Sequence, residues 1–263
     1  MKINKIYLGC LSMMLLALAS CKKGDQNFFY KGDLLPITLT GFNGSSEELN
    51  VKVDTFKFAV PLQPNSSFVQ SNSYEFRGTE DRVKLLVSEK KTGKVVMERE
   101  LKKEDGPVKI NFLYMDGKAI AMPAKPAIED GKISLIYMFQ PTVTKYTEPV
   151  DFVVGKYYVT PQVFEEIVRA KNVKPNEFST PVTLPTFSVA RQDYNGVMTS
   201  VSFVVRICKA GTNTLYTDGT TYTWNALSST APKPAASVAS SKLYIFSELP
   251  SGNSMRFATR LEQ

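Results

Sequence analysis

Hydrophobic and polar residues alternate along much of the chain after Leu35, with the period of two that is typical of half-buried β-strands. Leu49, Val51 and Val53 follow this pattern on odd-numbered positions, whereas the next apolar positions, 56, 58 and 60, are even-numbered. We expect a β-bulge at residues 54–55, because one extra residue would keep both apolar sets on the same face.

Turn residues divide the rest of the chain into further strand-like runs. Asn195 and Gly196 form the pair that most strongly favours a two-residue hairpin turn, and Gly93 ends a similar turn. The sequence therefore predicts a mainly β fold. The further expected strands cover residues 83–88, 94–102, 108–115, 119–122, 132–139, 152–159, 187–194, 197–208, 214–217, 221–224, 242–246 and 255–261.

One segment carries a helical pattern instead. The threonine and proline at residues 160–161 suit the start of a helix. Phe164, Ile167 and Val168 are spaced by three and four residues, which would place them on one face of that helix. We expect an α-helix near residues 161–171 that closes one end of a β-sandwich.

The region after this predicted helix contains two further features of interest. Tyr216, Tyr222 and Trp224 share one parity around an Asp-Gly turn, so they form either an aromatic platform for a sugar or a partner, or the inward face of a hairpin. Residues 227–241 are rich in Ser, Ala and Pro, a composition that buries little apolar surface. We expect residues 227–241 to form a mobile surface loop.

A different hydrophobic pattern opens the chain. Lys2 and Lys5 precede the uncharged apolar run Ile6–Ala19, which is shorter than the roughly 20 residues of a membrane-spanning helix. A charged start followed by a short apolar run is typical of a secretory signal. The run ends in Leu-Ala-Ser followed by Cys21.

This ending resembles the lipobox of bacterial lipoproteins of the Bacteroidetes type. The resemblance implies a signal peptide over residues 1–20, acyl chains such as palmitate on Cys21, and a tether over residues 21–34. Several acyl chains together anchor a protein stably, so the expected location is the outer membrane, with its cell-surface or periplasmic face left open. The alternative is an ordinary cleaved signal with an incidental cysteine.

A second resemblance covers residues 83–122. The hairpin turn Lys91-Thr92-Gly93 and the later Gly106 and Gly117 turns resemble those of prealbumin-like (transthyretin-like) sandwich domains. The resemblance implies a β-sandwich scaffold over residues 35–143 and no particular chemistry. Residues 144–263 would then form a second, immunoglobulin-like β-sandwich.

Composition excludes several classes of function. The chain has a formal net charge of +7, but its basic residues are interleaved with acidic ones, so we expect no nucleic-acid partner. It contains no histidine, which removes Ser-His-Asp and Cys-His catalysis and the common histidine-bearing zinc sites. Cys208 would be the one cysteine inside the folded part, and we expect it to be buried in a strand. We expect no metal and no cofactor.

These features together predict an all-β protein with two antiparallel β-sandwich domains, the second with one short α-helix. The expected function is non-catalytic: a cell-envelope lipoprotein that binds a protein or glycan partner at the outer membrane. The alternative is a structural subunit of a surface assembly such as a pilus or adhesin, in which residues 255–261 would be a strand suited to donation.

Overall fold

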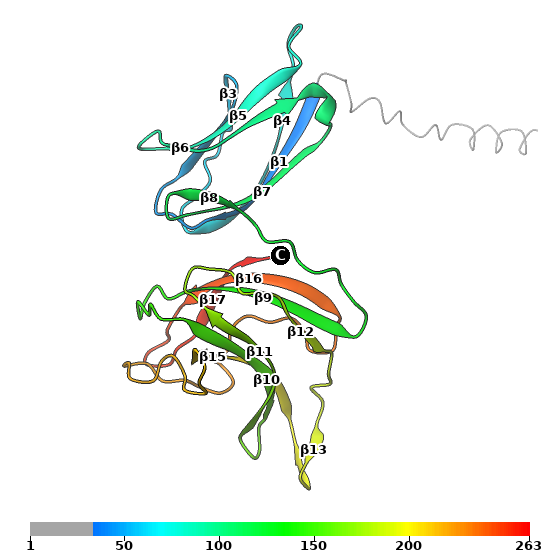
Figure 1. The fold of residues 1–263 in the computed structure, drawn as a ribbon, viewed down its shortest axis with the longest axis vertical. Helices are drawn as coiled ribbons and strands as arrows, with labels where there is room; N and C mark the ends of the chain where they lie inside the picture. Colours follow the sequence, from blue (N-terminus) through cyan, green and yellow to red (C-terminus); the bar gives the residue numbers. More distant parts are fainter. Residues whose placement is uncertain (1–33) are drawn as a thin grey trace, which may run out of the picture. The chain divides into compact units, whose positions relative to one another are not determined.

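The computed structural model describes residues 34–263, and within this range the regular elements are β-strands apart from one short 3-10 turn at Lys103–Asp105 (Figure 1). The predicted all-β class is confirmed. No helix in the described range is long and apolar enough to cross a membrane. The strands are β1 (Leu34–Asn43), β2 (Leu49–Val53), β3 (Phe56–Lys57), β4 (Ser66–Glu75), β5 (Arg82–Glu89), β6 (Val95–Lys102), β7 (Val108–Met115), β8 (Lys118–Ala121), β9 (Lys132–Gln140), β10 (Val150–Tyr158), β11 (Val163–Val173), β12 (Val182–Pro185), β13 (Gln192–Tyr194), β14 (Val197–Thr199), β15 (Val201–Lys209), β16 (Ser240–Glu248) and β17 (Phe257–Glu262).

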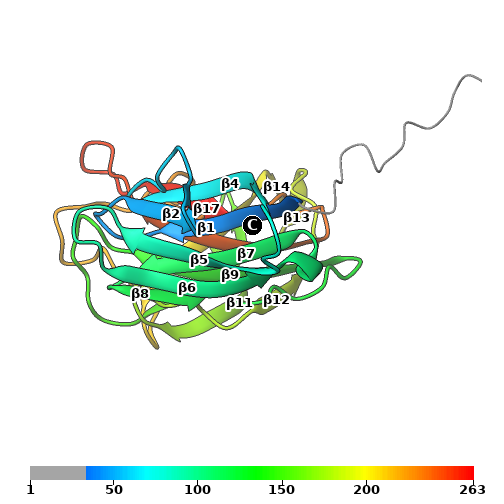
Figure 2. The same cartoon turned by 90° about the horizontal axis from the view of Figure 1, so that it is seen from above.

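The strands form four larger sheets and one small hairpin. The sheet orders are β4-β1-β7-β8, β3-β2-β5-β6, β12-β9-β16-β17 and β11-β10-β15, with β13 and β14 paired separately. Figure 2 shows β5 and β6 side by side, as their antiparallel register requires. β16 runs parallel to β9, from Ser240 opposite Ile133 to Ser247 opposite Gln140.

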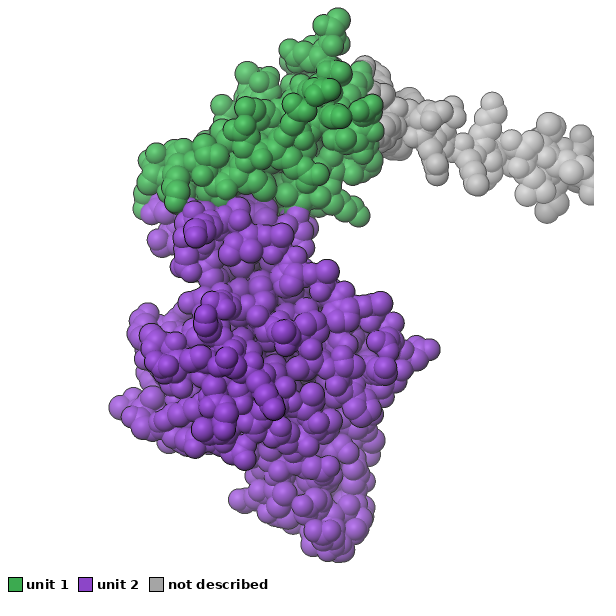
Figure 3. Space-filling view, in the orientation of Figure 1, with its two compact units in different colours: residues 1–39, 49–61, 69–110 green, residues 40–48, 62–68, 111–263 purple. Residues whose placement is uncertain are grey.

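The chain divides into two compact units, coloured separately in Figure 3. Among the described residues, the first comprises residues 34–39, 49–61 and 69–110; the second comprises residues 40–48, 62–68 and 111–263. In the first unit, β5 and β6 show why the sequence forms strands. One face of β5 is buried, and its other face carries ion pairs to β6, such as Lys84 Nζ to Glu98 Oε1 at 2.8 Å.

The second unit has a hydrophobic core that draws on two sheets. Residues of β9, β12 and β16 from one sheet and of β10, β11 and β15 from the other belong to the same buried cluster. Aromatic rings fill its centre: the ring centroids of Tyr137 and Phe152 lie 4.8 Å apart, and those of Phe139 and Phe246 lie 5.3 Å apart. Cys208 is buried in β15, as predicted.

The predicted helix at residues 161–171 is wrong. These residues belong largely to β11, which pairs antiparallel with β10 after a turn in which Gln162 has a φ of 57°. β11 takes two steps, from Val168 to Glu166, while β10 takes one, so Ile167 is an extra residue in the ladder. Ile167 and Val168 pack against the core, whereas Phe164 contacts Arg206 on the opposite face, so the helix-like spacing of three and four joins apolar residues of two faces.

The predicted bulge at Asp54–Thr55 is wrong as well. β2 and β3 pair antiparallel on either side of these two residues, with Val53 opposite Phe56. Asp54 has a φ of 50°, a left-handed conformation that aspartate tolerates in two-residue hairpin turns. The change of parity marks the reversal of the chain.

The Ser-, Ala- and Pro-rich segment is less exposed than its composition suggests. Ala231 is 0% exposed and Ala236 is 5% exposed, and both belong to the core of the second unit. The backbone N–H of Ala231 donates to the carbonyl of Val205 at 3.0 Å, and the Tyr137 hydroxyl donates to the carbonyl of Pro232 at 3.0 Å. Small side chains here let the backbone approach the core closely. Part of the segment therefore packs against the core of the second unit and is not a surface loop.

Two predicted strands, residues 214–217 and 221–224, form turns and isolated bridges instead. Leu215 bridges to Cys208, and Thr223 bridges to Ser254. Conversely, the sequence patterns did not predict β4 or β12.

Candidate functional site

The three aromatic residues of the predicted platform lie at the core rather than on an open surface. Tyr216 is 1% exposed, and Tyr222 and Trp224 are partly buried against the same core. The rings of Tyr216 and Trp224 meet edge to face, with centroids 6.4 Å apart. Tyr216 therefore offers no ring face to a ligand, and the inward-face interpretation of these residues fits the structure.

The predicted lipid-attachment residue, Cys21, lies outside the described residues. Its role stays a prediction.

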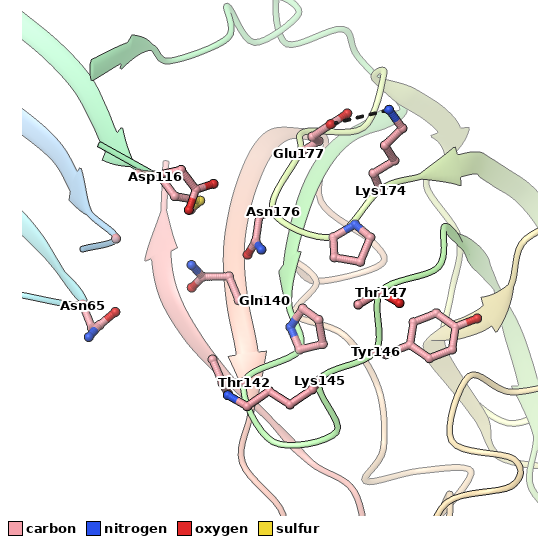
Figure 4. A pocket seen from close by; sticks show the side chains of 14 residues that line it. Asn65, Asp116, Gln140, Thr142, Lys145, Tyr146, Thr147, Lys174, Asn176 and Glu177 are labelled. Atoms are coloured by element: carbon pink, nitrogen blue, oxygen red, sulfur yellow. Dashed lines mark ion pairs between the residues drawn. The ribbon is translucent and has the colours of Figure 1, made fainter. Parts of the chain in front are cut away.

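A polar pocket with a volume of about 590 Å³ lies in the second unit (Figure 4). Most of its wall comes from three segments: the end of β9 with the connection to β10, the turn between β11 and β12, and the β7–β8 turn. One residue before β2 and one residue after β3 complete it. Its lining residues are Gly44, Asn65, Met115, Asp116, Gln140, Pro141, Thr142, Lys145, Tyr146, Thr147, Lys174, Pro175, Asn176 and Glu177.

Turn chemistry places Asn176 at this pocket. The turn of residues 174–177 has proline followed by asparagine, and Asn176 adopts a φ of 64° that asparagine tolerates better than most residues. The Asn176 N–H donates to the carbonyl of Phe139 at 2.9 Å, which fixes the turn beside the end of β9. Figure 4 shows the side chains of Asn176 and Gln140 next to each other.

A buried carboxylate holds the connection between β9 and β10. Glu248, at the end of β16, is 2% exposed and accepts hydrogen bonds from the N–H groups of Val143 at 2.6 Å and Thr144 at 2.7 Å. It also accepts hydrogen bonds from the hydroxyl groups of Thr144 and Tyr216. Burial, followed by the charge of Glu248, raises the pKa of Tyr216 well above its ordinary value. Glu248 is thus a positioning residue for the connection that lines the pocket.

Tyr146 gives this connection an aromatic side chain. Its ring meets that of Tyr216 edge to face, with centroids 5.7 Å apart, and it packs against the core of the second unit. Burial raises the pKa of Tyr146, and the neighbouring Glu148 adds to this effect. One side of the ring is therefore fixed by packing.

Several polar side chains of the pocket form no hydrogen bond with other described residues. These side chains carry amide, carboxylate or hydroxyl groups, and they belong to Asn65, Asp116, Gln140, Thr147 and Asn176. Such groups can both donate and accept hydrogen bonds, or accept strongly in the case of Asp116. The pocket thus offers a set of hydrogen-bonding groups that are not used internally.

The charges around the pocket balance. Two lysines, Lys145 and Lys174, face two acids, Asp116 and Glu177, and Lys174 Nζ lies 3.8 Å from Glu177 Oε1. A pocket without net charge favours a neutral polar ligand over a strongly charged one. Within residues 34–263 there is no group of three or more histidine, cysteine or acidic residues that could hold a metal ion.

Sequence patterns did not reveal this pocket, because its residues come from five separate connections. The one local signal was the Pro175–Asn176 pair, which indicates a turn but not its surroundings.

No protein-family model matches the chain, and no curated protein matches it significantly. Two solved structures from Bacteroides thetaiotaomicron show weak likeness. A leucine-rich repeat protein is 12% identical, with a TM-score of 0.16; the match covers 70% of this chain, which spans only 25% of that protein. A candidate polysaccharide-binding protein is 6% identical, with a TM-score of 0.17, and the match covers 86% of this chain and 95% of that one. Likeness at this level does not establish a common fold.

Proposed function

We propose that this protein is a non-catalytic binding protein of the cell envelope that holds a neutral, hydroxyl-rich glycan in the polar pocket. The observation that supports this proposal is the convergence of amide, carboxylate and hydroxyl side chains without internal partners in a pocket with balanced charge. Sugars present many hydroxyl groups, and amide and carboxylate groups match them as donors and acceptors. Tyr146 adds an apolar surface for a sugar ring.

The test is a binding measurement with paired variants. The Asn176→Gly change removes the amide but keeps a residue that tolerates the φ of 64°. Asn195→Gly is the matched control, because Asn195 has a φ of 51° in the β13–β14 turn and does not line the pocket. After a glycan array identifies a neutral ligand, calorimetry should show a loss of affinity of about three- to tenfold for Asn176→Gly, in line with one lost hydrogen bond.

Asn195→Gly should bind the same glycan like the unchanged protein. Absence of any neutral glycan ligand would sink the proposal, and so would an equal loss of affinity in the two variants.

The membrane anchor at Cys21 and the division into β-sandwich domains at residues 35–143 and 144–263 belong to the same proposal. The lipobox supports the anchor. The shared core of the sheets containing β9 and β10 supports a second sandwich, but one that also includes β9, at residues 132–140. A Cys21→Ala protein should fail to incorporate labelled palmitate and should leave the membrane fraction. Incorporation at the unchanged level would contradict the anchor.

The alternative, a subunit of a surface assembly, has less support in the arrangement of the last strand. β17 pairs with β16 within its own sheet, and Leu261 is 8% exposed in a hydrophobic cluster of the second unit. Donation of this strand to another subunit would first have to remove it from that sheet. Light scattering on the concentrated protein separates the two functions, because an assembly subunit should form higher oligomers.

A further inference from the structure

The sheet β11-β10-β15 has a second face, opposite the core. Phe152 and Val154 of β10, with Val205 of β15, point into the core, so the alternate residues occupy the other face. On that face the cross-strand register places Arg206 opposite Val153, and Tyr157 opposite Ser202. We call this the outer face.

Arg206 on the outer face has an aromatic partner and no acidic one. Its guanidinium carbon lies 4.0 Å from the ring centroid of Phe164 in β11, a cation–π contact. Its Nε atom is buried without a hydrogen-bond partner, and the side chain forms no ion pair with any described residue. A buried donor without a partner is uncommon in folded proteins and calls for a ligand or solvent.

The position of Phe164 depends on a glycine. A Cβ atom at Gly155 would lie 2.9 Å from Cζ of Phe164 and 2.0 Å from the carbonyl oxygen of Glu165. Glycine therefore lets the Phe164 ring lie close against β10, and the ring in turn supports the guanidinium of Arg206. The guanidinium is held in place before any ligand arrives.

The electrostatic environment of Arg206 also favours a bound anion. Burial lowers its pKa, and only Cys208 and Tyr157 act in the opposite direction. No carboxylate compensates for the partial desolvation of this cation, and a bound anion would supply that compensation.

We propose that Arg206 binds the carboxylate of an acidic sugar, a hexuronic acid unit of a glycan, on the outer face. The N–H groups of a guanidinium lie in the plane of the guanidinium, so stacking one face on an aromatic ring leaves them able to donate to a carboxylate. The hydroxyl groups of Tyr157, which is 7% exposed, and Ser202 form no hydrogen bond with other described residues. They lie four residues along the ladder from Arg206, so they would meet a neighbouring sugar unit of the same glycan.

The strand edges favour a sugar acid over an acidic peptide. An extended peptide would bind by pairing its backbone with a free strand edge. The edge of β15 near Arg206 is already occupied, because the N–H of Ala231 donates to Val205 and the N–H of Tyr216 donates to Ile207. The site thus offers side-chain groups but no free backbone ladder along β15.

The inference shares with the proposed function only the expectation of a glycan ligand, since Arg206 does not line the polar pocket. The probe is an oligomer of galacturonic acid, compared with the same oligomer as its neutral methyl ester. We expect the unchanged protein to bind the acid at least about tenfold more tightly than the ester, and this preference should weaken as salt is added.

Arg206→Met should abolish the preference for the acid. Arg206→Lys should retain part of it, because lysine keeps the positive charge but lacks the planar pair of N–H donors that binds a carboxylate through two hydrogen bonds. Arg256→Met is the matched control, because Arg256 is exposed in the same unit and its side chain forms no hydrogen bond or ion pair with other described residues. It should leave the preference unchanged.

Three results would overturn the inference: equal binding of acid and ester by the unchanged protein, an equal effect of the two Arg→Met changes, or tighter binding of an oligoglutamate peptide than of the sugar acid. The comparison of acid and ester needs no variant, so it decides even if Arg206→Met does not fold. Asn176→Gly separates the two proposals, because it should weaken binding of neutral glycan without changing the ratio of acid to ester.

Discussion

Two arginines on the outer face of the same sheet have opposite surroundings. Arg169 donates hydrogen bonds from all three guanidinium nitrogens, to Glu166, to Asp151 and to two acceptors in residues 212–213. Arg206 lies on the other edge strand of that sheet, and its side chain stacks on Phe164 and makes no hydrogen bond or ion pair with any described residue. The same side chain therefore stabilises the fold in one place and stays free for a ligand in the other.

The difference arises from the strand irregularities around Arg169. The ladder between β10 and β11 shifts register after Val150, so that Asp151, 1% exposed, also accepts from the N–H groups of Asn172 and Gly211. A carboxylate buried in this way requires a cation. Arg206 also lies opposite Val153, on the other side of β10. Its guanidinium stacks on Phe164, however, while Asp151 bonds to Arg169.

Loss of Arg169 should give the largest effect. Arg169→Met leaves Asp151 as a buried charge without its cation, and we expect a loss of about 3–5 kcal/mol in the free energy of unfolding. Chemical denaturation of both proteins measures this difference. A loss below about 1 kcal/mol would contradict the conclusion that Arg169 stabilises the fold by compensating the buried charge of Asp151.

Gly155 lies between the two arginine environments, and its substitution should give the next largest effect. Gly155→Ala brings a methyl group to 2.0 Å from the carbonyl oxygen of Glu165, so β10 and β11 must separate locally. We expect a loss of about 3 kcal/mol, at the upper end of overpacking effects. The same variant should lose the preference for the acidic sugar. Unchanged thermal unfolding would contradict the expected clash between β10 and β11 at Glu165.

Acid should weaken the Arg169 cluster only slightly. The hydrogen bond from Arg169 lowers the pKa of Glu166 below its ordinary value, against a smaller opposing effect of burial. Its contribution to stability is complete above the ordinary glutamate pKa of about 4.3 and is lost as the pH falls through the lowered folded-state value. Because the Glu166 side chain is 40% exposed, we expect less than about 1 kcal/mol. Denaturation curves of the unchanged protein and Glu166→Gln between pH 6 and pH 3 should show a steeper fall for the unchanged protein.

Arg206→Met should change stability least. Replacement of a half-buried, unpaired cation by an apolar side chain removes a desolvation cost and keeps much of the packing, so we expect a change within about 1 kcal/mol, toward higher stability. Thermal unfolding measured beside Arg169→Met gives the comparison directly. A loss as large as that of Arg169→Met would mean that Arg206 has a structural role and would remove the contrast.

Sequence patterns predicted the strands that show regular alternation or an uninterrupted apolar run between turn residues. The expected run 108–115 coincides with β7, and the runs at 83–88 and 132–139 lie within β5 and β9. Where the alternation breaks, the same method failed. β11 was predicted as a helix because apolar residues from its two faces are spaced by three and four, and Asp54–Thr55 was predicted as a bulge although it is a hairpin turn.

The sites could be predicted even less than the strands. The unpaired state of Arg206 depends on what surrounds it across three strands, and the polar pocket depends on connections far apart in the sequence. A sequence shows which residues can bind but not which of them already have partners. The weak alternation of β4, whose residues are mostly polar or exposed, explains why that strand was missed.

The parallel pairing of β9 with β16 has a consequence for the order in which the chain can fold. β16 is an inner strand of its sheet, between β9 and β17, yet it begins about a hundred residues after β9 ends. During synthesis, β9 therefore cannot complete its pairing with β16 until the chain has been synthesised beyond Glu248. Contacts between such distant segments slow folding, and they leave the incomplete chain open to aggregation or to capture by a chaperone.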